Sequence, residues 1–139
     1  MPTAQEQFDE LCFYTLAHGQ PEFIHQHAVD AFAAQLADES TKPITLVFAL
    51  IGLYLHAEQG FTGRQVQLAH MRMAAHRKTW HKPALVKSCG TLTVADALAA
   101  APGPARDAAI RAWATDVWAA WHERREEIIA LSRSELGVG

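Results

Sequence analysis

The chain has 139 residues, the length of one ordinary domain, which is enough to bury a sizeable core. Half of its residues are hydrophobic and the formal net charge is only −3, so the composition does not favour a nucleic-acid partner. The most hydrophobic segment, Ile44 to Leu55, is shorter than a membrane span, and Met1 to Glu10 lacks the pattern of a signal peptide. We therefore expect a cytoplasmic protein with no membrane partner.

The spacing of apolar residues predicts an all-α, single-domain bundle of about six helices over residues 1–139. The expected helices cover residues 4–17, 21–37, 43–59, 62–80, 93–101 and 105–134. Thr62 to Gln65 and Thr93 to Asp96 have the pattern of a capping box, which opens a helix. The helix at 43–59 is apolar on all sides and is expected at the centre of the bundle. Gly52 within it is expected to let a neighbouring helix approach closely.

Histidines are the most unusual feature of the chain, which has eight of them. At 100° per residue, His25 shares its side of the second helix with three apolar residues, Val29, Phe32 and Leu36. His27 points nearly the opposite way, on the side of Asp30. We therefore expect His25 on the buried stripe, and both histidines in one pocket only if this helix lies between two neighbours.

His70 is also expected to point inward, because apolar residues stand four positions before it and three after it. Inward histidines from two helices, with a nearby carboxylate, could form a metal site in a helix bundle. The candidate ligands for a divalent metal such as zinc are His25, Asp30, His56 and His70. The alternative is that these histidines are neutral core residues bonded to a carbonyl or carboxylate, and no HExxH motif favours the metal.

Arg64 stands at the start of the fourth helix, where free backbone amides could hold an anion. Capping by Thr62 and Gln65 explains the same residues without a ligand.

Several segments together resemble an uncharacterised bacterial family of unknown function, whose core pattern is His-x3-Val-Asp-Ala-x2-Ala-Gln. The matching positions are His25, Val29 to Ala31, and Ala34 with Gln35. The resemblance covers roughly residues 12–70 and extends to further segments, Tyr14 to His18, Lys42 to Ile44, Gly52 to Leu55 and Gly63 to Gln67. Some members carry cysteine pairs before this core that look like zinc ligands, and this chain lacks them. The resemblance implies no established activity.

These observations favour a domain that binds a small molecule or assembles with a copy of itself, as a homodimer through helical faces. Its pocket would be lined by histidine and aspartate, with seven candidate residues, His25, His27, Asp30, Gln35, His56, Arg64 and His70. The alternative is a metal-dependent, hydrolase-like enzyme in which the histidines hold a metal that activates water.

Overall fold

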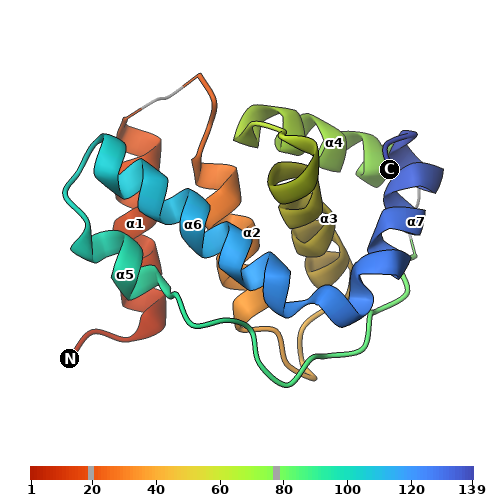
Figure 1. Cartoon of the computed structure of the whole chain (residues 1–139), viewed down its shortest axis with the longest axis horizontal. Coiled ribbons are helices and arrows are strands. Elements are labelled where there is room, and N and C mark those ends of the chain that lie inside the picture. Colours follow the sequence, from red (N-terminus) through yellow and green to blue (C-terminus); the bar gives the residue numbers. More distant parts are fainter. Residues whose placement is uncertain (19–20, 77–78) are drawn as a thin grey trace.

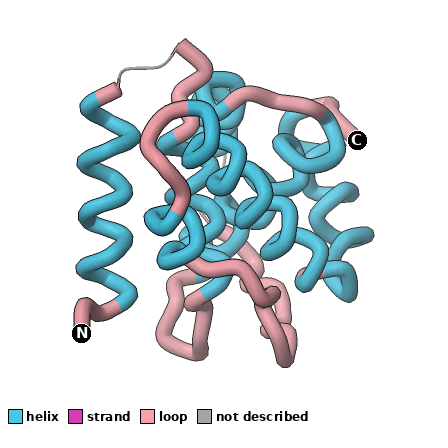
Figure 2. The backbone as a smooth tube through the Cα atoms, turned by 60° about the vertical axis from the view of Figure 1, so that its left-hand side comes forward, coloured by secondary structure: helices cyan, strands magenta, loops and turns pink. Residues whose placement is uncertain are grey.

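The computed structural model describes residues 1–18, 21–76 and 79–139, and within them every regular element is a helix (Figure 2). In chain order these are α1 (Ala4–Ala17), α2 (His25–Gln35), α3 (Pro43–Gln59), α4 (Gly63–His76), α5 (Val94–Ala99), α6 (Pro104–Ala120) and α7 (Arg125–Leu136), with a 3-10 turn, η1 (His122–Arg124), between the last two. The all-α bundle expected from the sequence is confirmed.

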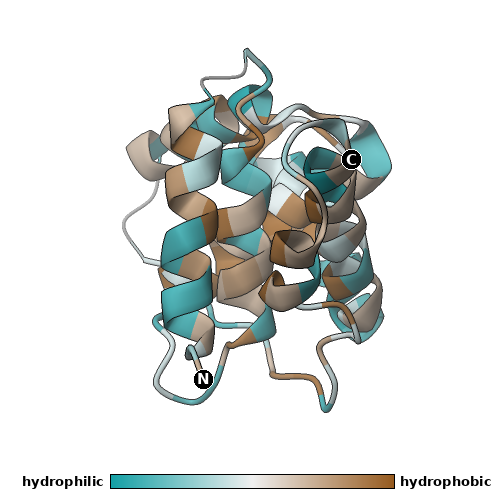
Figure 3. Ribbon diagram, turned by 90° about the vertical axis from the view of Figure 1, so that its left-hand side faces the viewer, coloured by the Kyte–Doolittle hydropathy of each residue, from teal (hydrophilic) through white to brown (hydrophobic). Residues whose placement is uncertain are grey.

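Three helices, α2, α3 and α6, contact one another and form the centre of the bundle (Figure 1). Helices α1 and α5 cover one end of it, while α4 and α7 cover the other. Hydrophobic residues recur along the helices (Figure 3), and the buried ones form one core cluster. In α3 the run from Ala49 to Leu55 is buried, so the expectation that this helix is central is confirmed. No helix among the described residues is long and apolar enough to cross a membrane.

Both expected capping boxes are present. The Thr62 amide donates a hydrogen bond to Gln65 Oε1 at 2.8 Å, and the Gln65 amide donates one back to Thr62 Oγ1 at 3.2 Å. Thr93 and Asp96 exchange the same pair of bonds at the start of α5. The short side chains of threonine at these positions satisfy amides that would otherwise have no partner, which explains why both helices begin there.

The expectation that the second helix begins at Pro21 is wrong, because α2 begins at His25. Phe23 has a φ of 55°, in the left-handed region that a bulky residue rarely adopts, and a helix cannot pass through it. The Phe23 carbonyl lies so close to Gly63 that any side chain at position 63 would collide with it. The packing of this connection on the start of α4 therefore sets where α2 begins.

The expected single helix over residues 105–134 is also wrong, because the chain turns after Trp121. The Trp121 and Arg124 amides donate to carbonyls three residues earlier, a tight winding typical of a 3-10 turn. After the turn, α7 packs on α3 and α4 and buries Ile128 and Leu136. No proline or glycine marks this break in the sequence, so tertiary packing determines it.

The fourth helix ends earlier than expected, at His76. Residues 77 and 78 of the expected helix lie outside the described residues. Trp80 is in the connection to α5, where its ring packs edge-on against Phe48 of α3, with ring centroids 5.2 Å apart. Trp80 is thus buried in the connection that follows α4 and is outside the helix expected at 62–80.

Tyr14 ties α1 to the start of α6. Its hydroxyl donates a hydrogen bond to Asp107 Oδ1 at 2.9 Å and accepts one from the Gly103 amide at 2.8 Å. The tyrosine and the aspartate are both buried, so these bonds satisfy polar groups that water does not reach.

Replacing this tyrosine in the variant Tyr14→Phe is expected to lower the free energy of unfolding by about 1–2 kcal/mol, because the Gly103 amide and Asp107 lose a buried partner. Urea denaturation at pH 7 measures the change. Tyr54→Phe is the control, because the Tyr54 hydroxyl receives its bond from the exposed Gln59 side chain. Equal stability of Tyr14→Phe and the wild type would contradict the prediction.

Candidate functional site

The most buried face of α2 carries polar residues. His27 is 4 % exposed and Asp30 is 3 % exposed, and three alanines complete this face, Ala28, Ala31 and Ala34. The alanines have small side chains, so α3 and α6 can pack closely on this side of the helix. We call His27, Asp30 and His56 of α3 the central polar cluster.

His25 lies on the other side of α2, and the expectation that its stripe is the buried one is wrong. His25 and Phe32 are only partly buried, and Leu36 at the end of the stripe is 51 % exposed. This side faces α1, where His25 Nδ1 lies 2.9 Å from Thr15 Oγ1. The second helix does lie between neighbours, as the sequence analysis required for a shared pocket. Helix α2 has α1 on one side and α3 and α6 on the other.

The imidazole rings of His27 and His56 stack on each other, with centroids 3.8 Å apart and an interplanar angle of 26°. Burial lowers the pKa of His27 from 6.5 to about 3, with smaller contributions from His56 and Arg111. Burial also lowers the pKa of His56. Hydrogen bonds of its ring with the backbone of Phe61 and Arg111 raise this pKa and partly offset the effect of burial. Both rings are therefore held in the neutral form at neutral pH.

The Asp30 carboxyl group fills the space next to Gly52 of α3. A Cβ atom at position 52 would lie 2.8 Å from Asp30 Cγ and would collide with Asp30 Oδ2. This confirms the expectation that Gly52 allows a neighbouring helix to approach closely. His27 faces His56 and Asp30 faces Gly52, so α2 and α3 run in opposite directions and the two contacts occupy adjacent turns.

Burial raises the pKa of Asp30 well above its ordinary value, and a hydrogen bond from Gln26 opposes this rise. Gln26 Nε2 donates that bond to Asp30 Oδ1 at 3.0 Å. Burial thus shifts the equilibrium of Asp30 toward the protonated acid. The two imidazoles and the carboxyl group of the central polar cluster can donate and accept hydrogen bonds and exchange protons.

Two buried atoms of the central polar cluster have no hydrogen-bond partner, His27 Nδ1 and Asp30 Oδ2. Among the described residues the Trp121 indole nitrogen and the Ser132 hydroxyl share this property, but neither side chain is ionisable. Buried polar atoms in folded proteins nearly always have a partner, so two such atoms on neighbouring ionisable residues require an explanation.

Two polar side chains elsewhere between the helices, Gln35 and Glu58, do have hydrogen-bond partners. Gln35 donates from Nε2 to the carbonyl oxygens of Cys89 and Leu92, at 3.2 and 2.6 Å, and its Oε1 accepts a bond from Trp113 Nε1 at 2.9 Å. It therefore holds the connection before α5 against α2 and α6. The predicted pocket residue Gln35 is a structural bridge between these segments.

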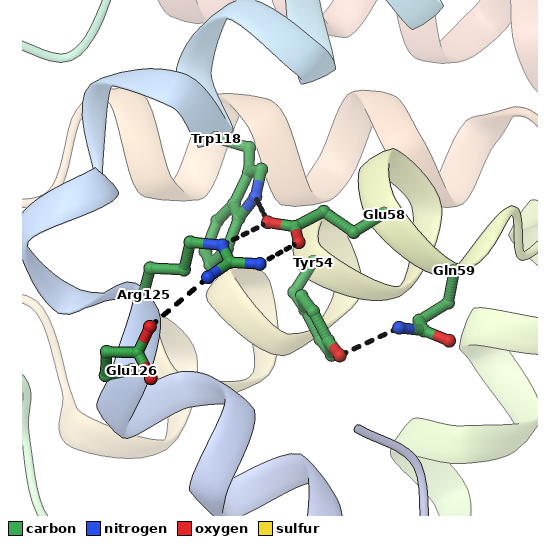
Figure 4. Close-up of polar contacts among 6 residues, drawn as sticks. All are labelled: Tyr54, Glu58, Gln59, Trp118, Arg125 and Glu126. Carbon is green, nitrogen blue, oxygen red and sulfur yellow. Dashed lines mark hydrogen bonds and ion pairs between the residues drawn. The ribbon is translucent and has the colours of Figure 1, made fainter.

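Glu58 of α3 is likewise supplied with donors (Figure 4). It accepts a bond from Trp118 Nε1 at 2.8 Å and two bonds from the Arg125 guanidinium, at 2.8 and 2.6 Å. These bonds join α3, α6 and α7 and lower the pKa of Glu58, chiefly through Arg125. The Glu58 side chain is 26 % exposed, so its donors satisfy a group at the edge of the interface between these helices.

Two other predicted site residues, His25 and His70, make their hydrogen bonds outside the central polar cluster. His70 Nε2 donates to the Phe48 carbonyl at 2.7 Å, while His25 contacts α1. Helices α2 and α4 are neighbours as the metal hypothesis needs, but each of these two rings is bonded to a different helix. Within residues 1–18, 21–76 and 79–139, no three His, Cys, Asp or Glu side chains form a group that could hold a metal ion.

The anion site suggested at the start of α4 has its amides occupied by the protein. The Arg64 amide donates to the Glu22 carbonyl at 2.9 Å and the Gln65 amide to Thr62. The Arg64 guanidinium lies over the Phe23 ring, 4.6 Å from its centroid. Arg64 therefore holds the connection before α2. Thr62 and Gln65 cap the helix, as in the alternative stated from the sequence.

Sequence reasoning missed one member of the site. Arg111 of α6 acts electrostatically on both His27 and His56, and its backbone bonds to the His56 ring. Arg111 is far in sequence from both histidines and belongs to no motif. It lies next to them because α6 packs on α2 and α3.

Comparison with known proteins identifies a family. The profile of a family of unknown function, DUF5946, matches residues 2–122, which is most of the chain. No curated protein and no solved structure matches the chain. The match includes all of α1 to α6 and every residue of the central polar cluster, and it ends within η1. The chain therefore belongs to the family of unknown function DUF5946.

Proposed function

We propose that this protein is a small-ligand-binding domain whose site is the central polar cluster of His27, Asp30 and His56. The observation that carries the proposal is the pair of buried, unpartnered atoms His27 Nδ1 and Asp30 Oδ2. A ligand with its own hydrogen-bonding groups would supply the partners that the protein does not.

The energetic argument is that an unpartnered buried polar group costs about 1–3 kcal/mol of stability. Apolar residues of similar size at positions 27 and 30 would avoid this cost, since the surrounding residues are mostly alanine and apolar side chains. Gln35 and Glu58, by contrast, have hydrogen-bond partners on neighbouring segments. Polar groups without partners are expected where a function requires them.

Binding is better supported than metal-dependent hydrolysis. The hydrolase hypothesis needs three or four converging ligands and an open position for water, and the described residues offer no such group. The predicted homodimer is a separate proposal. Phe13 on α1 and Met71 on α4 are exposed apolar side chains at opposite ends of the bundle, so they offer two alternative contact faces.

The proposal is tested by thermal denaturation in the presence of a panel of simple probes. The panel contains zinc and manganese ions, sodium phosphate, sodium acetate and neutral amides. A ligand at a hundred times its dissociation constant adds about 2.7 kcal/mol to stability, which is about 10 °C in melting temperature for a domain of this size. We expect at least one class of probe to raise the melting temperature of the wild type and not that of His27→Gln.

The matched control is His122→Gln, the same substitution at an exposed histidine outside the cluster. It should respond to the probe as the wild type does. His56→Gln, at a partly buried position, provides a second test if His27→Gln does not fold, as judged by circular dichroism. If no probe shifts the melting temperature, or if the cluster variants respond as the wild type does, the proposed function is wrong.

A further inference from the structure

Arg111 forms the exposed edge of the central polar cluster. Its side chain is 43 % exposed, and its backbone bonds to the ring of His56. The guanidinium Nη2 lies 3.5 Å from Glu22 Oε2, and the Glu22 side chain is 63 % exposed. Such a long ion pair on the surface is weak, so the guanidinium is readily transferred to a stronger partner.

The charge of Arg111 reaches both stacked rings. It is one of the causes that lower the pKa of His27 and the pKa of His56, in each case after burial. Arg111 therefore makes a positive contribution to the electrostatic potential at the two neutral rings. This contribution disfavours a metal cation and favours an anion.

We propose that the central polar cluster binds a small oxyanion, a carboxylate or a phosphate, between Arg111 and the stacked rings of His27 and His56, and that binding transfers a proton to this histidine pair. The inference rests on the proposed function and names its ligand class. The guanidinium matches the geometry of two oxygens of such an anion, and the unpartnered Nδ1 of His27 supplies a further N–H donor. The transferred proton comes from solvent, and no covalent bond of the ligand changes.

Glu22 is the internal competitor for this ligand. Its carboxylate forms an ion pair with the Arg111 guanidinium and has the same chemistry as a carboxylate ligand. An incoming anion takes the place of Glu22 on Arg111. Removing the charge of Glu22 should therefore strengthen anion binding, while removing the charge of Arg111 should weaken it.

The proton transfer gives binding a defined dependence on pH. Arg111 on α6 is the charged group that acts on both rings, and Glu22 in the connection before α2 pairs with Arg111. Asp30 stands one turn after His27 on α2, and α4 contributes the apolar Val66 beside Gly52 and Asp30. An anion stabilises an imidazolium, so affinity rises as the pH falls from 7.5 to 5.5. Ionisation of Asp30 at higher pH would repel the anion, so this effect also makes the affinity lower at higher pH.

The test is a titration of the full chain with sodium acetate and, separately, with sodium phosphate, followed through the ring ¹⁵N chemical shifts of His27 and His56. Sodium chloride at matched ionic strength is the blank. We expect Arg111→Gln to weaken binding by tenfold or more and Glu22→Gln to strengthen it by about threefold. Arg72→Gln, which changes the net charge equally at an exposed position on α4, should bind as the wild type does. The acetate and phosphate arms decide which oxyanion is preferred.

Three results would overturn this inference. These are equal affinity in Arg111→Gln and the wild type, affinity that does not rise in acid, and ring shifts no larger than those with sodium chloride. If zinc or a neutral amide instead stabilises the wild type and not His27→Gln, the anion inference is wrong and the proposed function stands. If no probe depends on His27 or His56, both are wrong.

Discussion

Gly52→Ala is expected to lower the free energy of unfolding by about 3 kcal/mol, although alanine is a better helix former than glycine. At a solvent-exposed position inside a helix the same change would raise stability by about 1 kcal/mol. At position 52 the added Cβ would collide with Asp30 Oδ2 and lie only 3.0 Å from Val66 Cγ1. The helices α2 and α3 must separate or Asp30 must leave its place, and such overpacking typically costs about 1–3 kcal/mol.

Urea denaturation of Gly52→Ala at pH 7 measures this cost, and the double variant Asp30→Ala/Gly52→Ala identifies its source. Removing the carboxyl group clears the space that the new methyl group needs, so the double variant should recover most of the stability lost by Gly52→Ala. Wild-type stability in Gly52→Ala would show that the contact between Asp30 and Gly52 is not close. Failure of the double variant to recover would place the collision at Val66 instead.

Local signals predicted some helices to the residue. The bounds of α1 and α3 agree with those expected from apolar spacing and proline position, and both capping boxes form. The errors fall before α2, where Phe23 keeps residues 21–24 out of the expected helix, and at Trp121, where the chain leaves α6 without a proline or glycine. Both places are fixed by contacts with distant segments, Phe23 with Gly63 and α7 with α3 and α4. Such contacts leave no trace in the local sequence.

The candidate site was predicted in part, and for the wrong face of the helix. The pattern assigned burial to the side of α2 with Val29 and Phe32, because bulky apolar residues usually lie in a core. The structure buries the side with alanines instead, since small side chains let α3 and α6 come closest there. His27, Asp30 and His56 were all named as candidates, yet their association with Arg111 depends on the packing of α6. A helix with bulky apolar residues on one side and alanines on the other can bury either side, so the sequence of α2 did not determine which side faces the core.

Burial without a partner makes His27 a strong determinant of acid stability. Its pKa is about 3 in the folded protein against 6.5 ordinarily, so the native state excludes a proton that the unfolded chain binds. The stability that this group contributes is fully present above pH 6.5 and is lost as the pH falls toward 3. Asp30 acts in the opposite sense, because its pKa is raised: its contribution is present in acid and is lost as the pH rises. A variant that lacks the His27 imidazole is needed to separate the contribution of His27 from that of Asp30.

We expect the free energy of unfolding to fall between pH 7 and pH 4 by about 3 kcal/mol more in the wild type than in His27→Gln. The contribution of Asp30 is common to both proteins and cancels in the difference. Urea denaturation at pH 7, 5.5 and 4 measures it, and the gap should open as the pH passes below 6.5. His122→Gln, at the surface, should keep the wild-type profile. Parallel profiles for the wild type and His27→Gln would mean that the buried ring accepts its proton without cost, through a rearrangement that gives Nδ1 a partner.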